Sequence, residues 1–359
     1  MKVSKFYIGI LLTLIAPFAM AQSSVTIYGR VNEDIEYMTG LPTSGGSSTS
    51  RVALKGGDLG TSLWGLQGSE DIGGGNKILF HFEDGFNGAT GQLGSTTSFW
   101  NRWAVVGTSN DSLGTALVGR QLNISYGVWY YDPMLQSAWS SASLVRGRTW
   151  HTTADSISYQ SPKVDGFDMY GQYSLSNATN WNGNGSTTQG RSDGLRLTYR
   201  SALFQVSGQY DETRDPANGR LDDVFLYSRE YLAAANVFLG QFKVQFAYQT
   251  SHADANPISV ASETRHVWGG LTWQATAAAS VVAAVYHINA NNGVGNATMY
   301  TLMTTYNISK RTMLDMQVAT VRNSKTGTFS LEANLPGSAD DPLAGHTQTG
   351  VYAGIQHQF

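Results

Sequence analysis

Segments of about ten residues, in which every second side chain is apolar or aromatic, recur from residue 25 to residue 359. Clear examples are residues 25–31 (VTIYGRV), 204–210 (FQVSGQY) and 242–248 (FKVQFAY). Because successive side chains of a strand point to opposite faces, each segment has one apolar and one polar face. After residue 21 no apolar run reaches the roughly 20 residues that a spanning helix needs, so a membrane role would have to be played by strands.

The connections between these segments alternate between short and long. Short connections lie at residues 72–75, 161–166, 201–202 and 307–310, and long ones rich in Gly, Ser, Thr and Asn at residues 39–60, 176–190, 211–227 and 323–347. Outer-membrane barrels have short periplasmic turns, long external loops and an even number of antiparallel strands. We therefore predict an all-β protein, a transmembrane antiparallel β-barrel of about 16 strands. A soluble propeller or sandwich also has many short strands, but the chain has no blade-length repeat of fixed motifs.

The first 21 residues have the pattern of a secretory signal peptide. Lys2 and Lys5 precede an apolar run over residues 6–18, and the small residues Ala19 and Ala21 predict cleavage after residue 21. Residues 22–359 would then form the barrel domain. The absence of cysteine excludes disulfide scaffolds and thiolate metal sites. Without the two lysines of the signal, 21 of the 23 basic residues remain against 26 acidic ones, which argues against nucleic-acid binding.

The last strand predicts how the chain ends in the membrane. Its lipid-facing row comprises Val351, Ala353, Ile355, His357 and Phe359, and its inward row Gly350, Tyr352, Gly354, Gln356 and Gln358. An aromatic last residue fits the aromatic girdle at the membrane interface, and His357 is interpreted as an interfacial ring in the same row. We expect Tyr352, Ile355, His357 and Phe359 to characterise a C-terminal strand used in barrel assembly.

Several short motifs, in this order and spacing, resemble the general diffusion porins of Gram-negative bacteria. They are residues 24–30 (SVTIYGR), 64–75 (WGLQGSEDIGGG), 83–86 (EDGF), 101–107 (NRWAVVG), 113–121 (LGTALVGRQ) and the final Phe359. The resemblance implies a homotrimer in the outer membrane that passes small hydrophilic solutes and ions by passive diffusion. Its implied partners are lipid, lipopolysaccharide, the barrel-assembly machinery and the solutes, and its third external loop, residues 121–151, would fold inward and narrow the pore.

The resemblance also assigns residues to the narrowest part of the pore, where charged side chains set the ion preference. Arg30 and Arg120 match basic wall positions, whereas Leu63 and Thr152 stand where the family has arginine. We expect positive charges from the loop to compensate, giving weak anion selectivity. The predicted constriction comprises Arg30, Arg102, Arg120, Asp132, Arg146, Arg148 and His151.

The same loop is rich in aromatic residues: Tyr126, Trp129, Tyr130, Tyr131 and Trp139. They could pack the loop against the inner wall, or form a stacking surface for a sugar or an aromatic acid in a more selective channel. Both interpretations stay open at this point.

Motifs for catalysis are absent from the sequence. It contains no G-x-S-x-G, H-E-x-x-H or G-x-x-x-x-G-K pattern, and its seven histidines are scattered singly. We therefore expect no enzyme activity, cofactor or metal. An outer-membrane hydrolase is a remaining alternative, because barrel residues distant in sequence can meet in space. An adhesin or purely structural barrel is another, although the polar inward rows favour an open lumen.

Overall fold

The structure is a computed structural model that describes residues 24–135, 137–175, 190–254, 260–333 and 335–359. The strands of its first half are β1 (Ser24–Pro42), β2 (Ser48–Gly56), β3 (Ser62–Gly73), β4 (Asn76–Asn87), β5 (Gln92–Leu93), β6 (Trp103–Asn110), β7 (Gly114–Leu122), β8 (Thr152–Gln160) and β9 (Phe167–Ser174). Those of its second half are β10 (Ser192–Arg200), β11 (Phe204–Thr213), β12 (Arg229–Leu239), β13 (Phe242–His252), β14 (Glu263–Gln274), β15 (Ala279–Ala290), β16 (Gly295–Asn307), β17 (Thr312–Asn323) and β18 (Gln348–Gln358). Two short helices, η1 (Ile124–Tyr131) and α1 (Ser141–Leu144), lie between β7 and β8.

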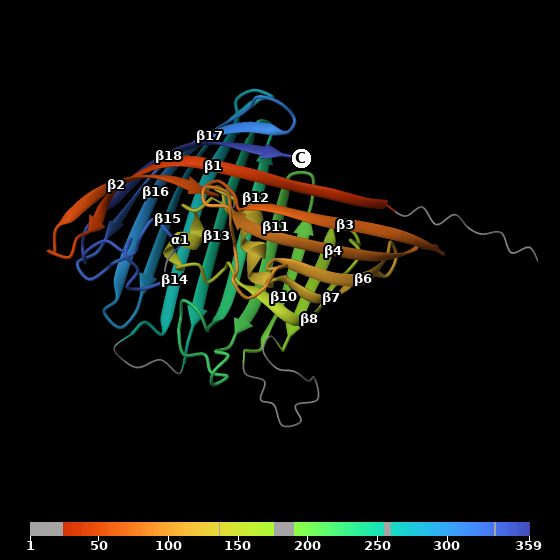
Figure 1. The fold of residues 1–359 in the computed structure, drawn as a ribbon. Coiled ribbons are helices and arrows are strands. Elements are labelled where there is room, and N and C mark those ends of the chain that lie inside the picture. Colours follow the sequence, from red (N-terminus) through yellow and green to blue (C-terminus); the bar gives the residue numbers. More distant parts are fainter. Residues whose placement is uncertain (1–23, 136, 176–189, 255–259, 334) are drawn as a thin grey trace, which may run out of the picture.

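All strands belong to one antiparallel sheet that closes on itself through the pairing of β1 with β18 (Figure 1). Strands β2 and β3 pair with successive parts of β1 and together act as one interrupted wall strand. Strand β5 has two residues and pairs with the end of β4. The wall is therefore a closed barrel of 16 strands, which confirms the predicted fold.

The two faces of the wall have opposite polarity. On β1 the side chain of Ile35 is 63% exposed on the outside, whereas its neighbours Asp34 and Glu36 are buried on the inside. On β13, Phe246 and Tyr248 face outward and Gln245 and Gln249 are buried inward. An apolar outer face with a polar inner face is the arrangement of a barrel that lies in lipid.

The barrel closes where the last residue meets the first strand. The backbone N–H of Phe359 donates to the Gly29 carbonyl oxygen at 3.0 Å, and the Gly29 N–H donates back to Phe359 at 3.2 Å. Tyr352 is fully buried on the inner face and Ile355 is exposed on the outer face, in the alternation expected for this strand. His357 lies beside Thr312 of β17, with 2.9 Å between its Nδ1 and the threonine Oγ1.

One expected loop is a hairpin instead. Residues 39–60 were predicted as a long connection from their Gly, Ser and Thr content, but β1 continues to Pro42 and β2 begins at Ser48. The reason is visible in β2, where Val52 and Leu54 alternate with Arg51 and Lys55 and so keep the period of a strand. The predicted signal, residues 1–21, and most of the predicted loop at 176–190 lie outside the described residues. Where the structure describes the chain, no helix is long and apolar enough to cross a membrane.

Candidate functional site

Residues 123–151, which we call the inner loop, run along the inward face of the wall (Figure 1). Gln205 of β11 donates to the Tyr131 hydroxyl at 2.8 Å, and the Trp268 indole of β14 donates to the Tyr131 carbonyl oxygen at 3.0 Å. Further along, the Gln317 amide of β17 donates to the Trp139 carbonyl oxygen at 2.7 Å. The loop is therefore fastened to one side of the barrel interior, from β11 to β17.

The start of the inner loop is determined locally by Asn123. Its side-chain oxygen accepts a hydrogen bond from the Ser125 N–H at 2.9 Å and so caps η1, while its amide nitrogen donates to Ser192 of β10. A side-chain acceptor at this position satisfies a backbone donor that a helix start leaves without a partner. The same residue thus starts the helix and ties it to the wall.

Asp132, expected as the acidic side of the constriction, has a structural role. It is fully buried, and its carboxylate accepts hydrogen bonds from the Met134 N–H at 2.8 Å, from the Ser141 N–H at 2.7 Å and from the Tyr286 hydroxyl of β15. These bonds hold the turn of the inner loop against the wall. Its placement in the constriction is therefore corrected, because this carboxylate is withdrawn from the lumen.

Arg146 and Arg148 also differ from expectation, because both are buried in ion pairs. Arg146 lies 3.0 Å from the Asp341 carboxylate, and its guanidinium lies over the rings of Phe225 and Phe329. Arg148 is completely buried and lies 3.0 Å from Asp211 and 2.9 Å from Glu230. Neither arginine supplies an unbalanced positive charge to the lumen, so the expected compensation from the loop is wrong.

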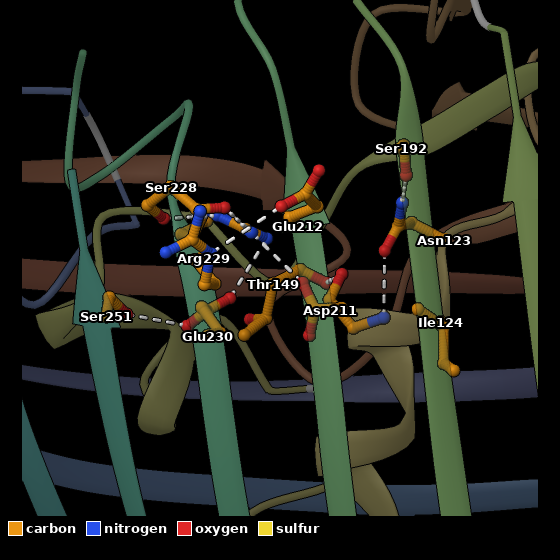
Figure 2. A network of polar contacts seen from close by, with 12 residues as sticks. Asn123, Ile124, Thr149, Ser192, Asp211, Glu212, Ser228, Arg229, Glu230 and Ser251 are labelled. Carbon is orange, nitrogen blue, oxygen red and sulfur yellow. Dashed lines mark hydrogen bonds and ion pairs between the residues drawn. The ribbon is translucent and has the colours of Figure 1, made fainter. Parts of the chain in front are cut away.

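The Arg148 pairs belong to a larger network that joins the inner loop to β11 and β12. Figure 2 shows Asp211, Ser228, Glu230 and Ser251 of this network. Arg148 also donates to the Ser228 hydroxyl and carbonyl oxygens, each at 2.8 Å. Glu230 accepts from the Ser251 hydroxyl at 2.9 Å. Buried charges need such partners, because an ion removed from water without compensation costs several kcal/mol.

His151, the third residue expected to add positive charge, is neutral near pH 7. Burial and, to a lesser degree, the positive charge of Arg148 lower the pKa of His151 to about 3. It closes the inner loop through its backbone, since its carbonyl oxygen accepts from the Asn123 N–H at 2.9 Å. His151 therefore adds no positive charge to the lumen near pH 7.

The wall arginines Arg30 and Arg102 lie on the inner face. The Arg30 Nε donates to the Thr61 carbonyl oxygen at 2.7 Å, and Arg30 interacts electrostatically with Arg102. Arg102 lies 2.6 Å from the Glu83 carboxylate, which also accepts from the Tyr28 hydroxyl at 2.7 Å. Glu83 thus forms the ion pair with Arg102 and also attracts the positive charge of Arg30.

Arg120 lies at an irregular point of the wall. Its neighbour Gln121 is buried on the inner face, and the Arg120 side chain lines the same cavity as Arg102 and Tyr126. There it donates to Thr152 at 3.1 Å and to Ser98 at 3.3 Å. The pairing of β7 with β8 shifts between Gly119 and Gln121, an irregularity that sequence motifs do not reveal.

The five loop aromatics divide between the two interpretations. Trp139 and Tyr131 are buried, and the Trp139 ring packs edge-on against Tyr352 with 4.9 Å between centroids. The Tyr126 ring packs edge-on against Trp129, with 4.1 Å between the ring centroids. Tyr130, in contrast, is 59% exposed toward the lumen. Packing therefore accounts for most of the set and leaves Trp129 and Tyr130 at the edge of an open cavity.

Two inward cations were missed by the sequence analysis. Lys243 lies on β13 in the inward row with Gln245, and Arg196 lies on β10 with its guanidinium between the rings of Tyr130 and Tyr170. Both occupy polar positions of alternating segments, so the period-two pattern contained the signal for them. The pattern does not indicate the position of each residue along the barrel axis.

Acidic side chains of the inner wall are mostly withdrawn from the lumen. Asp34, Glu36, Asp58 and Asp315 are each at most 4% exposed. They lie where the inner loop is attached, since the Asp58 carbonyl oxygen accepts from the Ala138 N–H at 2.6 Å. Within the ranges that the structure describes, no three His, Cys, Asp or Glu side chains form a metal-binding group.

A cavity of about 540 Å³ lies between the inner loop and the short connections of the barrel; we call it the turn-side cavity. The loop contributes Trp129, Tyr130, Pro133 and Leu135, and the wall contributes Arg30, Leu59, Lys243, Gln245, Thr272, Gln274, Ser280, Val282, Met303, Thr305, Met313 and Gln356. A second cavity of about 500 Å³ lies where β6 begins and is lined by Arg102, Arg120 and Tyr126 among others.

A closed barrel with an apolar outer face, a polar inner face and an interior narrowed by a loop defines an outer-membrane channel protein. The sequence profile of the Gram-negative porin family matches residues 10–326, and the chain belongs to this family. It is a porin of the outer membrane, a passive diffusion channel and not an enzyme.

Individual relatives agree with this assignment. An outer membrane porin protein of Bordetella pertussis is 27% identical over 256 residues, which are 66% of this chain and 66% of the relative. Outer membrane porin protein 32 of Delftia acidovorans is 28% identical over 356 residues, 95% of each chain. Among solved structures, the anion-selective porin from Comamonas acidovorans has a TM-score of 0.79 at 24% identity and covers 94% of this chain and 100% of its own. OmpF of Salmonella typhi has a TM-score of 0.67 at 17% identity, with coverage of 93% and 97%.

Proposed function

We propose that this porin favours anions, because the cations of its lumen are accessible while its acids are not. Arg30, Lys243 and Arg196 are each partly exposed on the inward face. The wall carboxylates Asp34 and Asp315 are buried. An ion in the narrow part of the pore therefore meets mainly positive charge, and basic residues in a pore favour anions.

The negative charge of the whole chain does not oppose this proposal. Its formal charge is −3, but most of the acids that contribute to it are paired with arginine, buried or placed at the rim. The field in a pore is set by charges within about 8 Å of the ion at physiological salt. The name of the similar anion-selective porin from Comamonas acidovorans points in the same direction.

The ion preference can be measured as the zero-current potential across a tenfold KCl gradient in a planar bilayer. We expect a zero-current potential whose sign indicates that anions permeate more easily than cations. Its magnitude should be below the limit of about 59 mV for a perfectly selective pore. Arg30→Gln removes a lumen cation and is expected to reduce this potential by roughly half. Arg311→Gln removes a cation from an exposed short turn and is expected to leave it nearly unchanged. A parent channel with cation preference would overturn the proposal.

We further propose that the porin assembles as a homotrimer through the outer face of β1 and β2. Val25, Ile27, Val52 and Leu54 are each more than 60% exposed there, a greater exposure than the large apolar outward residues of β13 to β18 have. A solved OmpT of Vibrio cholerae with the same fold is described in a trimer form. Sedimentation of the unheated protein in detergent is expected to give the mass of three chains. Ile27→Lys is expected to shift the mass toward one chain, and a monomeric parent would contradict the assembly.

A further inference from the structure

We propose that the turn-side cavity is a binding site for aromatic monocarboxylates, which pass through this porin by way of a defined subsite. The inference rests on the proposed anion preference and adds the chemistry of the solute. Three features of the cavity carry it: cations without acids, polar groups without partners, and an apolar wall.

The first feature is the charge of the lining. Arg30 reaches the cavity from β1 and Lys243 from β13, and the lining contains no aspartate or glutamate. Lys243 interacts electrostatically with the buried Asp132 but makes no hydrogen bond or ion pair within the described part of the chain. A carboxylate in the cavity would give Lys243 a charge-assisted hydrogen bond, which is stronger than a neutral one.

The second feature is a set of buried polar atoms that lack partners. Gln245 is 1% exposed, and neither its amide nitrogen nor its amide oxygen has a hydrogen-bond partner among the described residues. The indole N–H of Trp129 is also buried without a partner. Both residues line the cavity. Buried polar groups are nearly always satisfied, so these donors suit a ligand oxygen, with water in its place when the site is empty.

The third feature distinguishes the ligand from an inorganic ion or a sugar. Val282, Met303 and Met313 form an apolar patch on the wall, and Leu135 and the exposed Tyr130 ring face the cavity from the inner loop. Met side chains adapt to aromatic rings and make favourable sulfur contacts with them. A fully hydroxylated solute would leave its hydroxyl groups without partners on this patch. An aromatic ring that carries one carboxylate suits both parts of the cavity, because the ring fits the apolar patch and the carboxylate pairs with the cations.

The size of the site is consistent with such a ligand. A cavity of about 540 Å³ falls within the usual range of small-molecule sites, roughly 300–1,000 Å³. It lies on the side of the inner loop that faces the short connections, since Gln274 and Ser280 flank one of them. A solute bound there lies in the permeation path and would obstruct chloride.

The test is block of chloride current by sodium benzoate in planar bilayers, compared with acetate and benzyl alcohol. Acetate has the charge without the ring, and benzyl alcohol has the ring without the charge. We expect benzoate to halve the conductance at a concentration about tenfold or more below that of acetate, and benzyl alcohol to have no effect. Lys243→Met and, independently, Gln245→Leu are expected to raise the half-blocking benzoate concentration about tenfold. Lys310→Met, on an exposed short turn, should behave like the parent.

Binding is also measured without current, as benzoate quenching of tryptophan fluorescence in detergent, with Trp129→Phe as the variant that removes the signal. Equal block by benzoate and acetate would overturn the subsite, as would a Lys243→Met channel with unchanged benzoate affinity. In either case an anion-favouring zero-current potential would leave the proposed function intact. Cation preference of the parent would instead remove the proposed function itself, whatever benzoate does.

Discussion

Arg148→Ala is expected to produce the largest loss of stability of any single substitution in the inner loop. The change removes the positive member of a fully buried triad and leaves the carboxylates of Asp211 and Glu230 without a counter-ion. Removing one partner of a buried ion pair typically costs about 3–5 kcal/mol, because the remaining charge stays away from water. The variant should unfold at lower denaturant concentration, measured by tryptophan fluorescence, and its channels should show added current noise as this end of the loop detaches.

A charge-neutral triple variant separates the ionic effect from lost packing. In Arg148→Met with Asp211→Asn and Glu230→Gln, no buried charge remains, and replacing a buried pair by neutral groups of similar shape is often close to neutral. We expect this variant to recover most of the stability that Arg148→Ala loses. Arg265→Ala breaks the exposed pair with Glu263 on the outer surface and should change nothing measurable. Equal effects of Arg148→Ala and Arg265→Ala would contradict the anchoring role.

Gly350→Leu is expected to displace the inner loop into the lumen and reduce the single-channel conductance. A Cβ atom at Gly350 would lie 2.5 Å from Cη2 of Trp139, whose buried ring holds the loop against β17 and β18. The ring has no space to retreat, because Tyr352 packs against it. Overpacking of this kind costs about 1–3 kcal/mol, and the loop relieves it by moving inward.

The matched control for this substitution is Gly208→Leu. Gly208 also lies within a strand, but a Cβ atom there has no neighbour within 4 Å and points to the outer face. The added leucine would meet lipid, so stability and conductance should match those of the parent. If both variants conduct alike and unfold alike, Trp139 does not determine the position of the inner loop.

These two anchors explain how a loop with so little regular structure keeps a pore at a defined width. One end of the loop is held by charges at Arg148, and the other by the packing of Trp139 and the buried carboxylate of Asp132. Trp129 and Tyr130 precede these anchors, in the segment between Asn123 and Asp132, and line the turn-side cavity. The residues that narrow the pore and those that hold the loop are therefore different sets, although both come from the same 29 positions of the inner loop, residues 123–151.

The sequence by itself determined the barrel and its closure. The alternation around Ile35 on β1 and Phe246 on β13 is a property of any extended backbone, so it could be interpreted locally, without knowing which strands pair. The same holds for the last strand, where Tyr352 and Ile355 take opposite faces as expected. The loop expected at residues 121–151 overlaps the segment between the end of β7 at Leu122 and the start of β8 at Thr152.

Only the tertiary structure decided which charges act in the pore. Arg146 and Arg148 look like lumen cations in the sequence, but their counter-ions Asp341, Asp211 and Glu230 are between 63 and 195 residues away along the chain. The local sequence pattern determines whether a charged side chain points inward or outward. Its effect on the charge of the pore depends on counter-ions that other strands bring close to it. A pairing irregularity, which no motif encodes, lies at Arg120 and brings it beside Thr152 and Ser98. For the same reason Lys243, an ordinary inward lysine in the sequence, became a cation of the turn-side cavity only when the barrel closed around it.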